Sequence, residues 1–410
     1  MSMQKLWTKN FTIITLGTVV SMLGNAISGF AIGLLVLDYT DSTFLFALFM
    51  VVYNLPKIIM PMLAGPYLDN FSRARVIYSL DFLSSALYLG IYFLLRFDLF
   101  SYGPFLALAF LIGAIDGVYQ VAYDSLYPTL ISPGNLMRAY SISSMIAPVS
   151  MVMVPVAAYL YEVMGRLDPL FLFNALSFLV AACFETQIRA PETQTLHHDA
   201  PFTPAKFRED FRAGLRYLRG ERGLQIITAY FFVYMFAFGA SGTVVLPYFK
   251  MHEDLGMLWY CFVMGGGVLG RLLGGAIQYR YRFPASRKFA VAILIGAAGA
   301  IVEGVFLYFP VGVMMPLCLA SGLSAVICAN LRVSSTQSYV PDAYRGRFNG
   351  VFQMICTLGT ISGQLLSGAV ADTVGERPVL AAFMLLNLLA VLGILWPGRR
   401  AVRPIYNRDA

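Results

Sequence analysis

Ionisable side chains inside long apolar stretches are the residues of this sequence that could do chemistry. There are three bases and four acids: Lys57, Arg271, Arg332, Asp81, Asp116, Asp124 and Glu303. A charge at the centre of a bilayer costs about 2.5–3.5 kcal/mol on insertion scales, so residues of this kind usually carry ions or pair with one another. These residue types predict proton loading and release at carboxyl groups, together with ion pairing between helices.

Asp116 and Lys57 are the first candidates for proton coupling. Asp116 lies midway along the fourth apolar stretch, and Lys57 lies midway along the second, between Pro56 and Pro61. Prolines bend a helix and free backbone carbonyl groups, and a lysine there needs a carboxylate or a watery cavity. We predict that Lys57 pairs with Asp116 at similar depth, so that a proton or an anionic substrate on one group frees the other. The alternatives are a permanently paired structural acid and a lysine with no coupling role.

Asp124 and Arg332 occupy equivalent positions in the two halves of the chain. Each lies nine residues before a proline, Pro133 in the first half and Pro341 in the second. In transporters with pseudo-symmetric halves, such positions can face each other across a central cavity. We predict a salt bridge between them that closes the cytoplasmic side in the outward-open state, and the alternative is that each pairs within its own half.

Glu303 and Asp81 are the remaining acids of interest. Glu303 lies in the ninth apolar stretch and is a further candidate for proton coupling, although local pairing or a place at the lipid edge is the simpler interpretation. Asp81 lies one or two turns into the third stretch, and we group it with Asp69 at the preceding junction. Arg271 is expected to do the corresponding work in the second half.

Membrane-spanning helices are the elements that must position these residues. A spanning helix needs about 20 mostly apolar residues, and lipid forces each backbone group to pair within its own segment. The chain is 58% hydrophobic and 12% charged, against about 45–50% and 25% in soluble domains. We therefore predict an all-α membrane protein with twelve spans, at 11–36, 44–68, 76–95, 105–127, 139–161, 169–184, 224–248, 256–279, 288–309, 312–335, 348–371 and 378–396.

Basic residues predict the orientation of these spans. With the N-terminus taken as cytoplasmic, 22 Lys and Arg residues fall on that side and four on the other. An excess of Lys and Arg marks cytoplasmic loops, so we predict both termini in the cytoplasm and a multi-pass protein of the cell membrane. The net charge of +7 is then explained by the membrane topology and by attraction to anionic lipid, and it does not indicate nucleic-acid binding.

The long connection at 185–223 divides the spans six and six. We predict a six-helix bundle at 1–185, a cytoplasmic linker at 186–223 and a second bundle at 224–410. Apolar residues at helical spacing beside a basic stripe predict an amphipathic helix on the membrane surface, with a solvated linker helix as the alternative. The apolar residues are Phe207, Phe211, Leu215 and Leu218, and the basic ones are Arg208, Arg212, Arg216 and Arg219.

The junction of the second and third spans reads Gly65-x-x-x-Asp69-x-x-x-Arg73-x-Arg75. It resembles the cytoplasmic loop signature of the major facilitator superfamily, although Asn70 and Ser72 replace a basic residue and a glycine of that pattern. Segments Leu6–Phe11, Leu126–Leu130, Gly214–Leu218 and Val340–Arg347 are similar to the macrolide-efflux and drug:proton antiporter branch. The chain departs from antiporters of this kind in the fifth span, which keeps only Pro155 of a glycine-proline element, and at Ala109, where an arginine is expected.

The resemblance implies two pseudo-symmetric six-helix bundles that rock about a central cavity lined by spans 1, 4, 7 and 10. It also implies a conformational gate, for which the candidates are Asp69, Arg73, Arg75, Asp81, Asp124 and Arg332. An aromatic, sparsely polar cavity suits an amphiphilic solute. The cavity candidates are Asn25, Tyr119, Gln120, Tyr123, Tyr230, Tyr234 and Asn330.

We therefore expect a secondary active transporter that exports a small amphiphilic or hydrophobic compound in exchange for protons. The alternatives are an uptake symporter or facilitator, a lipid transporter, and a transport-dead membrane receptor. The sequence has no P-loop, Cys-x-x-Cys motif or Cys/His cluster, so we expect no enzyme activity, ATP use, metal or other cofactor. The expected partners are the substrate, protons and membrane lipid, and the expected state is a monomer.

Overall fold

Helices make up nearly all of the chain that the computed structural model describes, which is residues 6–68, 71–132, 136–189, 204–252, 255–280 and 283–407. Among these residues, eleven helices are long and apolar enough to cross a membrane, and the apolar part of α2 (Thr43–Leu68) forms a shorter one at Thr43–Lys57. Every predicted span therefore coincides with helix, and the predicted all-α membrane fold is confirmed.

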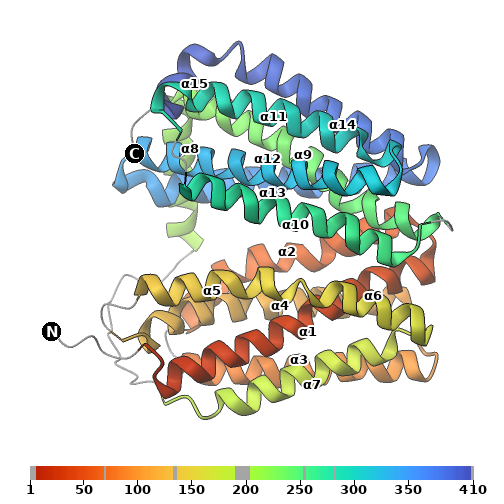
Figure 1. The fold of residues 1–410 in the computed structure, drawn as a ribbon. Helices are drawn as coiled ribbons and strands as arrows, with labels where there is room; N and C mark the ends of the chain where they lie inside the picture. Colours follow the sequence, from red (N-terminus) through yellow and green to blue (C-terminus); the bar gives the residue numbers. More distant parts are fainter. Residues whose placement is uncertain are drawn as a thin grey trace. The chain divides into compact units, whose positions relative to one another are not determined.

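The first half of the chain contains the helices of the first six predicted spans (Figure 1). They are α1 (Lys9–Thr40), α2, α3 (Arg73–Arg96), α4 (Tyr102–Leu126) with the 3₁₀ turn η1 (Tyr127–Leu130), α5 (Leu136–Ser150), α6 (Met153–Met164) and α7 (Asp168–Glu185).

The second half begins with α8 (Pro204–Gly220) in the connection and continues with six further spans. These are α9 (Arg222–Met251), α10 (Met257–Arg280), η2 (Ala285–Arg287) with α11 (Lys288–Val305) and η3 (Phe306–Tyr308), α12 (Val311–Tyr339), α13 (Asp342–Val374), and α14 (Glu376–Ala390) with the π-helical turn η4 (Val391–Leu395). The helix α15 (Arg399–Tyr406) follows.

Two compact units divide the chain. Unit 1 comprises Met1–Asp41 and Phe49–Phe202, and unit 2 comprises Ser42–Leu48 and Thr203–Ala410. The start of α2 belongs to unit 2 because the Asp372 carboxylate of α13 caps it. Asp372 accepts hydrogen bonds from the Ser42 hydroxyl (2.6 Å) and the Thr43 N–H (2.7 Å), and a carboxylate is favoured at the positive end of a helix.

The fifth predicted span is not one helix. It is divided between α5 and α6, and the break lies at Met151–Val152. Two prolines account for this, since Pro148 lies inside α5 and Pro155 falls in the first turn of α6. Each proline removes one backbone N–H from the helical ladder, and its ring disfavours a continuous helix.

Buried polar contacts hold α7 against α1 and α3 inside unit 1. The Asn174 amide of α7 donates to the Ser28 hydroxyl of α1 at 2.7 Å, and the Ser85 hydroxyl of α3 donates to the Ala175 carbonyl at 2.8 Å. Gly24 of α1 faces Asn174, and any side chain there would collide with it. Small residues and interhelical hydrogen bonds replace the hydrophobic driving force that is missing in lipid.

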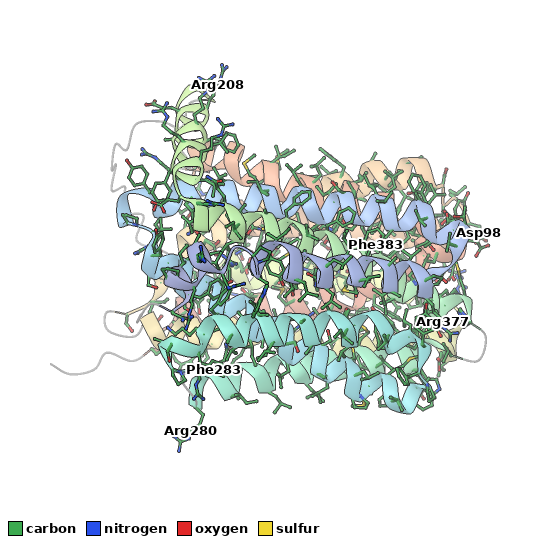
Figure 2. All side chains as sticks on the ribbon, turned by 90° about the horizontal axis from the view of Figure 1, so that it is seen from above. Asp98, Arg208, Arg280, Phe283, Arg377 and Phe383 are labelled. Atoms are coloured by element: carbon green, nitrogen blue, oxygen red, sulfur yellow. The ribbon has the colours of Figure 1, made fainter. Side chains whose placement is uncertain are left out.

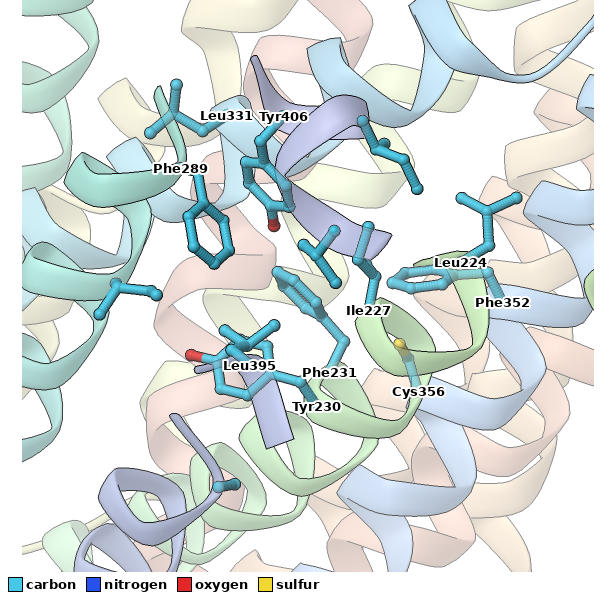
Figure 3. Close-up of a cluster of buried hydrophobic side chains, with 14 of the residues drawn as sticks. Leu224, Ile227, Tyr230, Phe231, Phe289, Leu331, Phe352, Cys356, Leu395 and Tyr406 are labelled. Carbon is cyan, nitrogen blue, oxygen red and sulfur yellow. The ribbon is translucent and has the colours of Figure 1, made fainter. Parts of the chain in front are cut away.

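The C-terminal helix α15 completes the core of unit 2 (Figure 3). Tyr406 is buried against Phe289 in a cluster that also contains Phe231 and Phe352. The next residue, Asn407, caps the start of α11, because its side-chain oxygen accepts from the Phe289 N–H at 3.0 Å. Burial raises the pKa of the Tyr406 hydroxyl, so this group stays neutral within the cluster.

The connecting helix α8 confirms the predicted helical spacing. Its apolar face does not lie open to lipid, however, because it packs against α13 and the core of unit 2. Tyr217 stacks on Tyr344 with ring centroids 4.8 Å apart, and a side chain at Gly214 would press on the backbone of α13. The arginines of the opposite face are exposed, and Arg208 points away from the packed core (Figure 2).

Candidate proton-coupling site

Two glycines of α4 bring the backbone of α2 close to Asp116. Gly113 and Gly117 lie one turn apart and flank the acid. A Cβ atom at Gly113 would collide with the Tyr53 carbonyl oxygen, and one at Gly117 would lie 3.2 Å from the Lys57 Cα. This Gly-x-x-x-Gly spacing allows close helix packing in membranes. It places the Asp116 side chain beside the segment of α2 that runs from Tyr53 to Lys57.

Lys57, Asp116 and Tyr53 form a compact polar cluster at this contact. The Lys57 Nζ lies 2.9 Å from Asp116 Oδ2, and the Tyr53 hydroxyl donates to the same oxygen at 3.0 Å. The Lys57 Nζ also lies 3.9 Å from the centroid of the Tyr53 ring. The predicted Lys57–Asp116 pairing is therefore present in the structure. Tyr53 was not predicted, although its spacing of four residues before Lys57 places both on one face of α2.

Partial exposure distinguishes this cluster from a sealed structural ion pair. The Lys57 and Asp116 side chains are 32% and 27% exposed. The Asp116 carboxylate is thus held by an ammonium and a phenol without being fully enclosed by protein. Protonation of Asp116 would remove the negative charge that holds Lys57. The arrangement can therefore couple a proton to the movement or exposure of a positive charge.

The structure describes only some of the gate candidates at the junction of α2 and α3. Asp69 lies outside the described residues. Arg73, in the first turn of α3, donates to the Ser125 carbonyl at 3.2 Å, which places a cation at the negative C-terminal end of α4. The Arg75 side chain is exposed. The gating role of these residues stays a prediction.

Asp81 is fully buried in unit 1, and its carboxyl group faces that of Glu185 in α7. The sequence prediction groups Asp81 with Asp69 and ends the sixth span at 184, one residue before Glu185. An acid at the very end of an apolar stretch normally reaches water, so the sequence carried no signal that Glu185 is buried.

Asp124 and Arg332 each have contacts inside their own unit. Asp124 is exposed and accepts a hydrogen bond from Gln120 at 2.9 Å. The Arg332 guanidinium lies over the Phe352 ring, 4.5 Å from its centroid, and 5.4 Å from that of Phe231. These contacts match the alternative in which each residue has partners within its half. The predicted salt bridge between the halves stays a prediction.

Glu303 is held by hydrogen bonds in unit 2. The Ser241 hydroxyl of α9 donates to Glu303 Oε1 at 2.5 Å, and the Ser321 hydroxyl of α12 donates to Oε2. Both carboxylate oxygens are thus occupied by donors from two neighbouring helices. This favours the local pairing that the sequence suggested as the simpler interpretation.

The predicted cavity residues differ in exposure. Tyr123 and Tyr230 are buried in the hydrophobic cores of their units, which favours a packing role for both. Asn330 is exposed and donates to the Gln278 side chain at 2.7 Å. Gln120 is also exposed, and Asn25, Tyr119 and Tyr234 are half-buried. Their contribution to a substrate cavity stays a prediction.

Comparison with protein families identifies one match over most of the chain. The family model of the Major Facilitator Superfamily matches residues 14–364. Among curated proteins, macrolide efflux protein A of Streptococcus pyogenes is 22% identical over 379 residues, covering 90% of this chain and 91% of that protein. An uncharacterized MFS-type transporter of Bacillus subtilis, YkuC, is 24% identical over 311 residues, covering 72% of this chain and 70% of that one.

Solved transporters share the fold at low sequence identity. The nucleoside transporter NupG has a TM-score of 0.70 at 11% identity, covering 95% of this chain and 98% of that one. A bacterial homologue of the iron transporter ferroportin, in an inward-facing state, has a TM-score of 0.67 at 17% identity, covering 99% and 100%. These likenesses show the fold alone.

Proposed function

Because this chain belongs to the major facilitator superfamily of membrane transporters, we propose that it exports a small amphiphilic or hydrophobic compound in exchange for protons. The observation that carries this proposal is the ion pair between Lys57 and Asp116, which joins the apolar helix α2 to the spanning helix α4 and is not fully enclosed by protein. An ionic group is costly at this depth, and it is retained where it moves ions or gates a path.

Asp116 is the proton carrier in this proposal. When ionised, it binds the Lys57 ammonium and accepts the Tyr53 hydrogen bond. A proton from outside neutralises the carboxyl group and releases Lys57, which changes the free-energy difference between conformations. A ligand shifts such an equilibrium only through its different affinity for the two states. The substrate and the proton therefore exchange places if each favours the opposite conformation.

Glu303 is not the carrier in this proposal. Its two oxygens accept hydrogen bonds from Ser241 and Ser321, so it fastens α11 to α9 and α12. To hold the helices together, Glu303 must accept these hydrogen bonds, but it need not bind and release a proton. Asp116→Asn and Glu303→Gln are therefore expected to have different effects on pH-driven transport.

The direction and substrate class rest on two further supports. The relative that covers most of this chain is named for macrolide efflux, at 22% identity, and that favours export. The aromatic side chains of Tyr119 and Tyr234 among the cavity candidates favour an amphiphilic compound over a sugar. We also propose a monomer, with lipid contacts on its apolar surface and both termini in the cytoplasm. A C-terminal reporter that is active only in the cytoplasm tests that orientation.

Export can be tested in cells and in vesicles. An efflux-deficient bacterial host that expresses the protein is challenged with a panel of amphiphilic compounds, and inverted vesicles then report dye or drug uptake driven by a pH gradient. Asp116→Asn is expected to abolish gradient-driven uptake. Glu162→Gln is the matched control, because Glu162 is an exposed acid of the same unit. Transport that ignores the pH gradient contradicts antiport, and ligand-induced stabilisation without any flux favours a receptor.

A further inference from the structure

Two buried carboxyl groups face each other at the contact between α3 and α7. Asp81 of α3 and Glu185 at the end of α7 are both 0% exposed. No described residue outside the pair donates a hydrogen bond to any of their four oxygens, and neither group has an ion pair with a described cation. The two carboxyl groups are instead each other's neighbours. Buried polar atoms in native proteins are nearly always paired, so this arrangement needs an explanation.

No described residue around the pair supplies a compensating positive charge. Among the described residues, the titratable groups that act on it all come from α4, and they are Asp116, Tyr119 and Tyr123. The Tyr119 hydroxyl is buried beside the pair and carries no charge that could compensate it. The helix α1 packs against the pair at Gly17, where a Cβ atom would lie 2.7 Å from Glu185 Oε1.

A single proton resolves this arrangement. Two ionised carboxylates in contact would combine mutual repulsion with the cost of desolvating both charges. One protonated carboxyl group becomes a donor, and it can then hydrogen-bond to its ionised neighbour. The net charge of the pair falls from two negative charges to one. The proton belongs to the pair and not to either residue alone.

We propose that Asp81 and Glu185 form a proton-binding site inside unit 1 that holds one shared proton and is separate from the Lys57–Asp116 pair. The site joins α3 to α7 where α1 also packs closely, so the proton is part of what keeps these helices together. Movement that admits water between α3 and α7 would release it. This inference does not depend on the substrate or on the direction of transport.

A proton fits this site better than a metal ion. Hard cations take six or more oxygen ligands in the case of Ca²⁺ and Mg²⁺. No group of three or more His, Cys, Asp or Glu side chains in the described part of the chain could hold a metal. The Gly17 backbone also closes one side of Glu185. A sodium ion is the remaining alternative, and the experiment below distinguishes it.

Infrared spectroscopy of the purified full-length protein tests the proposal directly. The carbonyl stretch of a protonated carboxyl group is separate from that of a carboxylate, and it shifts between H₂O and D₂O. We expect this band in the wild-type protein at about pH 8, well above the ordinary pKa of a carboxyl group. It should be lost in Glu185→Gln and in Asp81→Asn, because each amide supplies the missing donor without a proton. Asp116→Asn and Glu162→Gln should keep it.

Absence of the band from the wild-type protein overturns the proposal, as does its survival in both amide variants. The wild-type measurement keeps the test decisive if an amide variant fails to fold. A second readout is thermal stability against pH. If the folded protein holds one proton more than the unfolded chain, stability falls as pH rises, by up to about tenfold in the unfolding equilibrium constant per pH unit.

This pH dependence should be weaker in Glu185→Gln and unchanged in Glu162→Gln. Stability is also measured with sodium chloride replaced by choline chloride. Equal stability in the two salts is expected for a proton site. A loss of wild-type stability without sodium, absent from Glu185→Gln, would assign the site to that cation and overturn the proton assignment.

Discussion

Substitution of Lys57 should lower the free energy of unfolding by less in a variant that already lacks the Asp116 carboxylate than in the wild-type protein. The same should hold for substitution of Asp116 in a variant that lacks Lys57. A double-mutant cycle of Lys57→Met, Asp116→Asn and the combined variant measures this coupling free energy. The conservative sizes of these substitutions keep the helix contact at Gly113 and Gly117. Unfolding of the purified protein in mixed micelles provides the stability of each variant.

The structure sets the expected magnitude. Unit charges 4 Å apart attract by about 1 kcal/mol in water and about 4 kcal/mol at an effective dielectric constant of 20. The Nζ–Oδ2 distance is 2.9 Å, and side-chain exposure of 32% and 27% places the pair between these limits. Desolvation opposes the attraction. In the single variants, Tyr53 still offers a ring face to Lys57 or a hydroxyl to Asp116, which compensates by about 0.5–1 kcal/mol.

We therefore expect a coupling free energy of about 1–2 kcal/mol, within the range measured for residues in contact. The control cycle combines Lys57→Met with Glu162→Gln, two changes that share no described contact, and it should give a coupling near zero. A Lys57–Asp116 coupling that is no larger than this control would refute the argument that the pair interacts strongly enough to transmit a protonation event.

Three further predictions test separate contacts. Gly113→Ala should destabilise the protein by about 1–3 kcal/mol because its methyl group overlaps the α2 backbone, whereas Gly90→Ala, with open space around it, should be tolerated in the same thermal assay. Glu303→Gln should retain pH-driven transport within about twofold, since an amide keeps an acceptor for one serine; loss of coupling with normal expression would argue that Glu303 carries protons. For the predicted gate, Asp124→Arg combined with Arg332→Asp should restore transport lost in each single variant, and failure of this rescue would count against their pairing.

The positions of the spans could be predicted from the sequence because each span depends on local composition. Lipid requires an apolar stretch of set length, and that requirement is visible without tertiary contacts. The same depth argument paired Lys57 with Asp116 correctly, since two opposite charges at similar depth have few other partners. The break in the fifth span could have been predicted too, because Pro148 and Pro155 lie seven residues apart within it.

Tertiary placement accounts for what sequence reasoning missed. Glu185 stands at the end of an apolar stretch, and only the packing of α7 against α1 and α3 shows that it is sealed from water. The same applies to the face of α8, which has the composition of a membrane-surface helix but packs against α13. An amphipathic pattern shows that one face is covered, and it does not identify the covering partner.

Substrate accumulation in proteoliposomes tests the central claim most directly. Purified wild-type protein and Asp116→Asn are reconstituted side by side, and uptake of a transported compound is followed with and without an imposed pH gradient. The wild-type protein should accumulate the compound above its external concentration only with the gradient. Asp116→Asn should let the compound equilibrate in both conditions and accumulate it in neither. Gradient-driven accumulation by Asp116→Asn at the wild-type level would contradict the assignment of Asp116 as the proton carrier.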